Sequence, residues 1–212
     1  MQVRRKALLL PEPEGERTGA NGSGPALRLL ITGDSSAAGV GADTQSEALS
    51  GQLVQQLSRR RAVTWRLEAA TGHTTRDAIS RLRPLQGQTF DCAVIALGVN
   101  DVTRATSVSR FLASQSELWT LLKQQFGVRH ILSSGVPPIQ HFPLLPQPLA
   151  WVLGRHAARL DAGLGELADG HGNVTHIPLT LPQDPALAAP DGFHPNPAAY
   201  ALWAENLARH IP

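Results

Sequence analysis

The 212-residue sequence predicts a three-layer α/β/α sandwich built on a five-stranded parallel sheet. Five short apolar runs with strand character recur along the chain, at residues 27–32, 63–70, 92–97, 129–133 and 173–177. Helical patterns fill the stretches between them, and parallel strands need such crossover connections. A hydrophobic content of 42% over this length fits one domain with a sizeable core.

The chain is expected to begin with an N-terminal arm, residues 1–26, followed by a single domain, residues 27–212. Residues 11–26 are rich in Pro, Gly, Glu, Asn and Ser, and such a segment buries too little apolar surface to order itself. The basic start is followed by too short an apolar stretch for a signal peptide, and no run of about 20 apolar residues occurs. We therefore expect a soluble, cytoplasmic chain without stable membrane insertion, or a periplasmic or anchored one if an upstream leader was removed.

Apolar residues three to four positions apart predict the helices that connect the strands. One such face contains Ala48, Leu49, Leu53 and Leu57, and another contains Leu153, Ala157, Leu160, Leu164 and Leu167. The last helix has its own start signal, because Asn196 can cap it and Pro197 suits the first helical position. The whole pattern is typical of a flavodoxin-like domain.

Residues 136–148 contain five prolines, which exclude helix and sheet interior over most of this segment. It is expected to be a long surface loop. Exposed apolar side chains on a loop are costly unless they meet a ligand or fold back onto the protein. The residues concerned, which form either a wall of the substrate site or simple packing, are Ile139, Phe142, Leu144 and Leu145.

Charge and composition exclude several classes of function. The formal net charge of +2 does not favour nucleic-acid binding. The single cysteine, Cys92, lies in an apolar run and is interpreted as a buried side chain. The histidines show no paired metal-ligand spacing, so no metal or other cofactor is expected. Without coiled-coil heptads, the sequence does not reveal the oligomeric state.

Four loops that follow predicted strands or precede the last helix carry groups suited to catalysis. Ligands of parallel α/β sheets bind beyond the carboxyl ends of the strands. The four segments are Gly33–Gly39, Thr71–Thr75, Gly98–Asp101 and Asp191–Pro195. Each motif alone is weak, but together they hold a hydroxyl, an imidazole, a carboxylate and amide donors. Acyl transfer by a serine nucleophile needs these groups.

These four blocks, in this order, resemble those of the SGNH hydrolases, also called GDSL-type lipases and esterases. The resemblance implies a catalytic triad of Ser35, Asp191 and His194. It also implies an oxyanion hole formed by the backbone amides of Ser35 and Gly72 and by the side-chain amide of Asn100.

The last block, residues 191–196, looks especially like that of bacterial lysophospholipase, arylesterase and thioesterase members. The second block departs from the family pattern. Leu67 and Ala69 occupy places where the family often has Asn and a small residue, commonly Gly, so the assignment of Gly72 rests on the Gly-x-Thr-Thr portion.

The spacing of these residues also makes physical sense. Free serine is a poor nucleophile, so His194 must take the Ser35 proton during attack and return it to the leaving group. Asp191, three residues before His194, can reach the other ring nitrogen and select the tautomer. Pro195 and Pro197 stiffen the segment.

The sequence therefore predicts a metal-independent serine esterase or acyl hydrolase acting on a small-molecule ester, with thioesters and lysophospholipids as open alternatives. The apolar loop favours an acyl chain or aromatic ester over a sugar acetate. Two other functions stay open: a binding module that has lost turnover, and a metal-dependent phosphoesterase. The second of these would use Asp34, Asp101, Asp191 and His194.

Overall fold

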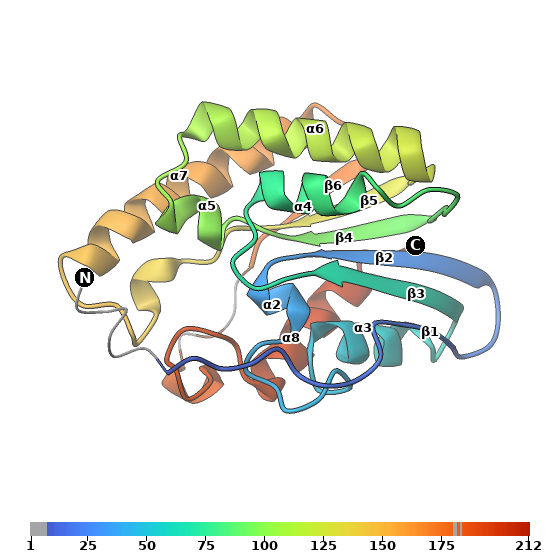
Figure 1. The fold of residues 1–212 in the computed structure, drawn as a ribbon, viewed down its shortest axis with the longest axis horizontal. Coiled ribbons are helices and arrows are strands. Elements are labelled where there is room, and N and C mark those ends of the chain that lie inside the picture. Colours follow the sequence, from blue (N-terminus) through green and yellow to red (C-terminus); the bar gives the residue numbers. More distant parts are fainter. Residues whose placement is uncertain (1–7, 180–181, 183) are drawn as a thin grey trace.

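The computed structural model describes residues 8–179, 182 and 184–212, and it has helices on both faces of a central sheet (Figure 1). The sheet has six strands in the order β1-β3-β2-β4-β5-β6. The strands are β1 (Thr18–Asn21), β2 (Ala26–Gly33), β3 (Ala62–Ala69), β4 (Cys92–Ala96), β5 (His130–Ser134) and β6 (Val174–Ile177). β3, β2, β4, β5 and β6 run parallel to one another, and β1 runs antiparallel to β3. The order of the five parallel strands is that of flavodoxin-like folds, which confirms the predicted fold class.

Two helices cover one face of the sheet, and three cover the other (Figure 1). The first face carries α3 (Leu49–Leu57) and α8 (Pro197–Ala208), and the second carries α4 (Thr75–Leu82), α6 (Val108–Phe126) and α7 (Leu149–Asp169). The short helices are α2 (Ser35–Ala38), α5 (Val99–Thr103), η1 (Ile139–His141) and η2 (Pro185–Leu187). Within the described residues, no helix is both long and apolar enough to cross a membrane.

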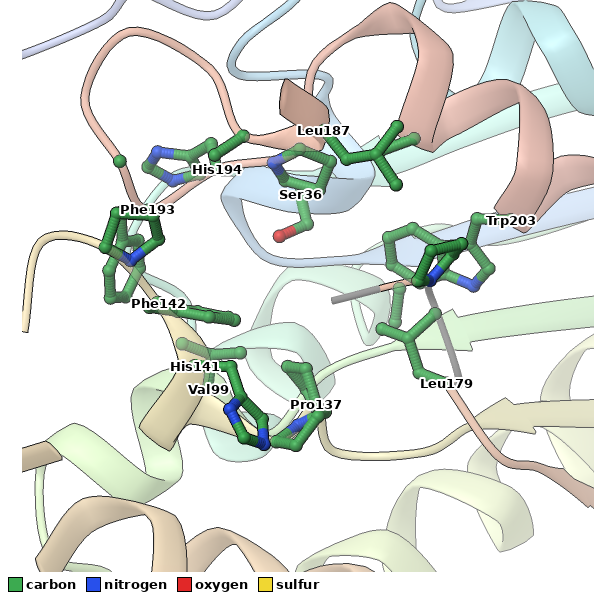
Figure 2. Close-up of a pocket in the computed structure, with 18 of the residues that line it drawn as sticks. Ser36, Val99, Pro137, His141, Phe142, Leu179, Leu187, Phe193, His194 and Trp203 are labelled. Atoms are coloured by element: carbon green, nitrogen blue, oxygen red, sulfur yellow. The ribbon is translucent and has the colours of Figure 1, made fainter. Parts of the chain in front are cut away.

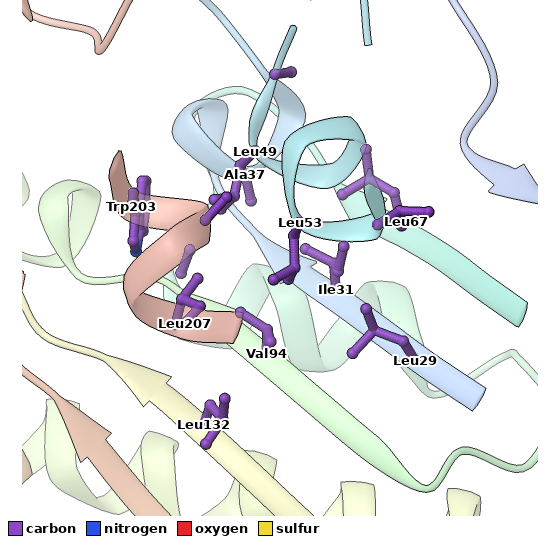
Figure 3. Packing of buried hydrophobic residues seen from close by; sticks show 14 of the residues in the cluster. Leu29, Ile31, Ala37, Leu49, Leu53, Leu67, Val94, Leu132, Trp203 and Leu207 are labelled. Carbon is purple, nitrogen blue, oxygen red and sulfur yellow. The ribbon is translucent and has the colours of Figure 1, made fainter. Parts of the chain in front are cut away.

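The core explains why the central strands β2 and β4 contain continuous apolar runs: a parallel sheet is buried on both faces. All five residues of β4 are buried. On one face, Leu29 of the sheet packs with Leu53 and Leu207 of the covering helices (Figure 3). Cys92 is buried there, and burial raises the pKa of its thiol to about 12, as suits a structural side chain.

Local hydrogen bonds fix the helix ends near the carboxyl edge of the sheet. The side chain of Asn196 accepts from the Ala199 N–H at 3.1 Å, and Pro197 occupies the first turn of α8, as the sequence predicted. Thr74 and Asp77 form a capping box at the start of α4. The loops before α4 and α8 are therefore anchored at their ends.

The N-terminal segment differs from the prediction. Composition predicted an unordered arm over residues 11–26, but Thr18–Asn21 form β1 and add a sixth strand to the sheet. All four residues of β1 are exposed, so apolar burial does not hold this strand in place. Backbone pairing with Val63–Arg66 of β3 holds it instead. Hydrophobicity alone could not reveal this, because an edge strand needs only a free neighbouring edge.

Candidate active site

Ser35, Asp191 and His194 meet at the carboxyl edge of the sheet. Nε2 of His194 lies 2.8 Å from Oγ of Ser35, and Nδ1 of the same ring lies 2.5 Å from Oδ2 of Asp191. Both ring nitrogens are therefore engaged. The imidazole is placed to take a proton from the hydroxyl while the carboxylate holds its other nitrogen.

Ser35 owes its position to the sharp turn between β2 and α2. A Cβ on Gly33 would lie 2.3 Å from the carbonyl oxygen of Ala96, so only glycine fits where β2 ends. Asp34 donates its N–H to the same oxygen at 3.1 Å, and its carboxylate accepts from the Ser36 N–H at 2.9 Å. Ser35 is thus the first residue of a capped helix, where backbone N–H groups have no partner within the helix.

Two further carboxyl groups stabilise loops at this edge. Burial raises the pKa of Asp34 to about 7, and the negative charge of Asp101 contributes to the rise. Oδ2 of Asp101 accepts from the N–H and Oγ1 of Thr75, both at 3.0 Å, and thereby ties α5 to the start of α4. Among the described residues, no three His, Cys, Asp or Glu side chains are arranged to hold a metal ion.

The Asp191 carboxyl group is surrounded by hydrogen-bond donors. Its Oδ1 accepts from the backbone N–H groups of Phe193 (2.9 Å) and His194 (3.0 Å). Burial alone would raise the pKa of Asp191, but the hydrogen bonds from His194 and Phe193 outweigh it and hold the pKa below its usual value. Asp191 therefore stays charged at neutral pH and can stabilise an imidazolium.

The two predicted oxyanion loops flank Ser35, because β2 lies between β3 and β4 in the sheet. Gly72 follows β3 with a φ of +82°, a conformation that favours glycine. Asn100 lies in the first turn of α5, after β4. In the part of the chain that the structure describes, the N–H groups of Ser35 and Gly72 have no protein acceptor. Both are therefore available to bind a ligand oxygen.

Side chains in α5 and directly after it hold the Gly72 loop in place. One side-chain N–H of Asn100 donates to the carbonyl oxygen of His73 at 3.1 Å, and the Arg104 guanidinium donates to that of Gly72 at 2.8 Å. Asn100 retains a second N–H on the same nitrogen. No sequence pattern points to Arg104, because nothing in the local sequence connects it with a loop 32 residues away.

A cavity of about 250 Å³ opens beside His194 (Figure 2). Its wall is mostly apolar, and the residues that line it include Val99, Pro137, Phe142, Leu179, Leu187, Phe193 and Trp203. Figure 2 shows the Ser36 hydroxyl directed toward the same space. The site therefore joins the Ser-His-Asp arrangement to an apolar binding surface.

Phe142, one of the four predicted wall residues, lines this cavity. Its ring meets that of Phe193 edge-on, with 5.1 Å between centroids. Phe193 in turn lies edge-on to the imidazole of His194 at 5.2 Å. The Pro-rich loop therefore reaches His194 through one aromatic ring, that of Phe193. The sequence analysis missed Phe193 as a wall residue.

The other three predicted wall residues do not line the cavity. Ile139 is fully buried in the core, and Leu145 packs against the same cluster. Leu144 contributes its backbone, since its N–H donates to the carbonyl oxygen of Gly192 at 3.0 Å. The prediction of a wall role is wrong for Ile139, because its side chain folds back onto the protein. Through the hydrogen bond between Leu144 and Gly192, the Pro-rich loop and the Asp191–His194 segment support each other.

Most of the chain resembles a known protein family. The sequence profile of the GDSL-like Lipase/Acylhydrolase family matches residues 31–202. Among curated protein sequences, none matches this chain significantly.

Many solved structures are similar in fold. One is a lipase from a goat rumen metagenome, with a TM-score of 0.72 and 15% identity over 87% of this chain and 97% of the other. A mutant acetylxylan esterase from Geobacillus stearothermophilus has a TM-score of 0.67 and 19% identity, over 88% and 94%. TesA has a TM-score of 0.67 and 21% identity, over 85% and 95%. At such identities the likeness shows the fold, and function must be argued from the site.

Proposed function

Because the chain belongs to the GDSL-like lipase/acylhydrolase family, we propose that it is a serine esterase that works through an acyl-enzyme on Ser35. The observation that carries this proposal is the continuous hydrogen-bonded chain from Ser35 through His194 to Asp191, beside an apolar cavity. A hydroxyl alone is a weak nucleophile, and these hydrogen bonds connect it to the base that activates it.

In the first half of the reaction, Oγ of Ser35 attacks the ester carbonyl carbon while Nε2 of His194 accepts the hydroxyl proton. The resulting oxyanion would be stabilised by the N–H groups of Ser35 and Gly72 and by the second N–H of Asn100. Each donor is worth on the order of 3 kcal/mol in the transition state. His194 then gives its proton to the leaving alcohol oxygen as the C–O bond breaks, which leaves the acyl group on Ser35.

The second half repeats these steps with water. His194 takes a proton from a water molecule, whose oxygen attacks the acyl carbon, and returns that proton to Oγ of Ser35 as the acid leaves. Asp191 stabilises the imidazolium in both halves without accepting the proton itself. No step requires a metal ion or an organic cofactor.

The cavity favours esters with an apolar acyl group. At about 250 Å³ the cavity lies just below the range of pockets that take drug-sized ligands, which fits a medium-length acyl chain or an aromatic acyl group. A sugar acetate would leave most of this apolar wall unused. Thioesters and lysophospholipids with such a chain belong to the same proposal, because the acyl cavity does not distinguish leaving groups.

Hydrolysis of p-nitrophenyl esters of two to sixteen carbons tests this function. We expect wild-type activity to peak at medium chain length and to persist in EDTA. Ser35→Ala should lower kcat by about 10⁴-fold or more. The control is Ser80→Ala, which removes an exposed hydroxyl on α4 and should leave kcat within about twofold. Wild-type activity in Ser35→Ala would rule out the mechanism.

A further inference from the structure

We infer that Glu12, in the N-terminal segment before the region matched by the family profile, is a positioning residue for the oxyanion hole. The inference rests on the proposed esterase function and adds a part to its machinery. It concerns the loop Thr71–His73, whose middle residue, Gly72, would donate its N–H to the oxyanion.

Glu12 contacts this loop through two short hydrogen bonds. Oε1 of Glu12 accepts from the backbone N–H of Thr71 at 2.7 Å and from Oγ1 of the same residue at 2.8 Å. These bonds join positions 59 residues apart in the sequence. The side chain of Glu12 is 30% exposed, so surrounding protein shields the contact in part from water.

Glu12 is itself held in place. Its Oε2 pairs with the Arg17 guanidinium at 2.9 Å, and the same guanidinium donates to the carbonyl oxygen of Ala69 at the end of β3. The carbonyl oxygen of Arg17 accepts the N–H of Leu67 at 2.7 Å. Between Glu12 and Arg17, the carbonyl oxygen of Glu14 accepts from the N–H of Gln45 at 2.9 Å. The residues that follow Glu12 are therefore anchored at two points.

The geometry of the backbone explains why this contact matters for Gly72. Its N–H belongs to the peptide unit between Thr71 and Gly72. Glu12 holds the preceding unit through the N–H of Thr71, and Arg104 holds the following unit through the carbonyl oxygen of Gly72. A Cβ on Gly72 would meet nothing within 4 Å, so packing of that residue does not fix the loop. Preorganisation of the N–H therefore depends on hydrogen bonds to the loop. The His73 N–H closes the turn onto the carbonyl oxygen of Ala70 at 3.2 Å, Asn100 and Arg104 hold the carbonyl side, and Glu12 holds the peptide unit before Gly72.

The charge of Glu12 suits this role. Burial alone would raise its pKa, but hydrogen bonds from Thr71 and Arg17 outweigh burial and hold the pKa below its usual value. The carboxylate is therefore ionised throughout the pH range in which a histidine base works. Hydrogen bonds to an ionised acceptor are about twice as strong as neutral ones.

Comparison of Glu12→Ala and Glu12→Gln with Glu16→Ala and Glu16→Gln tests the inference. Glu16 is exposed and, within the described residues, makes no side-chain hydrogen bond or ion pair, so its variants control for the loss of a negative charge. The measurements are kcat and KM for a p-nitrophenyl ester, thermal unfolding, and the inhibition constant of an alkyl boronic acid, which mimics the tetrahedral intermediate.

Glu12→Ala should lower kcat and boronate affinity in parallel, each by about tenfold or more, with KM nearly unchanged. Glu12→Gln should lose less, because its side-chain carbonyl can still accept from Thr71. A lower Tm with unchanged kcat and boronate affinity would overturn the inference, since it would show a role in stability alone. If Glu12→Ala fails to fold, the comparison of Glu12→Gln with Glu16→Gln decides. Equal kcat and equal boronate affinity in these two variants would refute the inference.

The same assay separates this inference from the proposed function. An active Ser35→Ala variant would refute the serine mechanism. An inactive Ser35→Ala together with a fully active Glu12→Ala would refute only the role of Glu12.

Discussion

Replacement of Asn100 by alanine tests the proposed oxyanion hole. The variant loses the amide that holds the carbonyl oxygen of His73 at 3.1 Å and whose second N–H we propose as a donor to the oxyanion. The lost donor should raise the activation barrier by about 3–4 kcal/mol, which is 10²- to 10³-fold in kcat. The lost bond to His73 should lower the free energy of unfolding by about 1 kcal/mol, or roughly 2–4 °C in Tm.

The effect on catalysis is measured by steady-state hydrolysis of a p-nitrophenyl ester and by inhibition with an alkyl boronic acid. The effect on stability is measured by a melting curve. Thr103→Ala is the matched control, because it alters an exposed α5 side chain that contacts the Asn100 backbone without removing a donor to the oxyanion. Its kcat should stay within about twofold of wild type. The reasoning fails if Asn100→Ala keeps more than about a fifth of wild-type kcat, since no donor is worth so little in a preorganised site.

Three further predictions concern the turn before Ser35, the clamp on Gly72 and the cavity wall. Burial raises the pKa of Asp34 to about 7, so the folded state keeps a proton that the unfolded chain releases near pH 4, and this carboxyl destabilises the fold as pH rises from 4 to 7. Asp34→Asn should therefore gain stability relative to wild type as the pH rises over that range. The gain is at most about 4 kcal/mol, at 1.4 kcal/mol per pKa unit. Urea unfolding measures it, and a stability difference between variant and wild type that is the same at pH 4 and pH 8 would contradict this prediction. Arg104→Gln should lower kcat and boronate affinity by on the order of tenfold with little change in KM, whereas the exposed Arg76→Gln should not. Phe142→Ala should raise kcat/KM for a twelve-carbon ester relative to a six-carbon ester by roughly threefold or more, because it enlarges the cavity; an unchanged ratio would place the acyl group elsewhere.

The parallel sheet was predictable because both of its faces are buried. Cys92–Ala96 is apolar throughout, and β2 contains a buried apolar run at residues 29–31, so these strands stand out without any partner information. The start of α8 was predictable for a local reason, since Asn196 and Pro197 encode a helix start within two residues. Elements determined by their own residues are those that the sequence reveals.

The triad residues could be proposed together for a similar reason. Asp191 and His194 lie three residues apart, and Ser35 follows a strand end between glycines, so each half has a local signal. Topology then brings the two halves together, because the loops after parallel strands share one edge of the sheet. The structure places Ser35 and His194 in hydrogen-bonding contact across 159 positions.

The parts that sequence reasoning missed depend on contacts between distant residues. β1 is exposed and is held only by backbone pairing with β3, so composition gave no sign of it. Glu12 and Arg104 reach the Gly72 loop from other elements, and charged side chains at such positions are most often surface residues. In the Pro-rich loop, neither helical nor strand periodicity separates the buried Ile139 from the cavity residue Phe142.

Trapping the intermediate shows directly whether Ser35 carries the acyl group. Wild-type protein is mixed with a medium-chain p-nitrophenyl ester, quenched in acid within one turnover, and analysed by intact mass and by peptide mapping. We expect a mass increase of one acyl group, located on the peptide that contains Ser35 and absent in Ser35→Ala. Steady turnover with no adduct, or an adduct on another residue that Ser35→Ala still forms, would contradict the acyl-enzyme on Ser35.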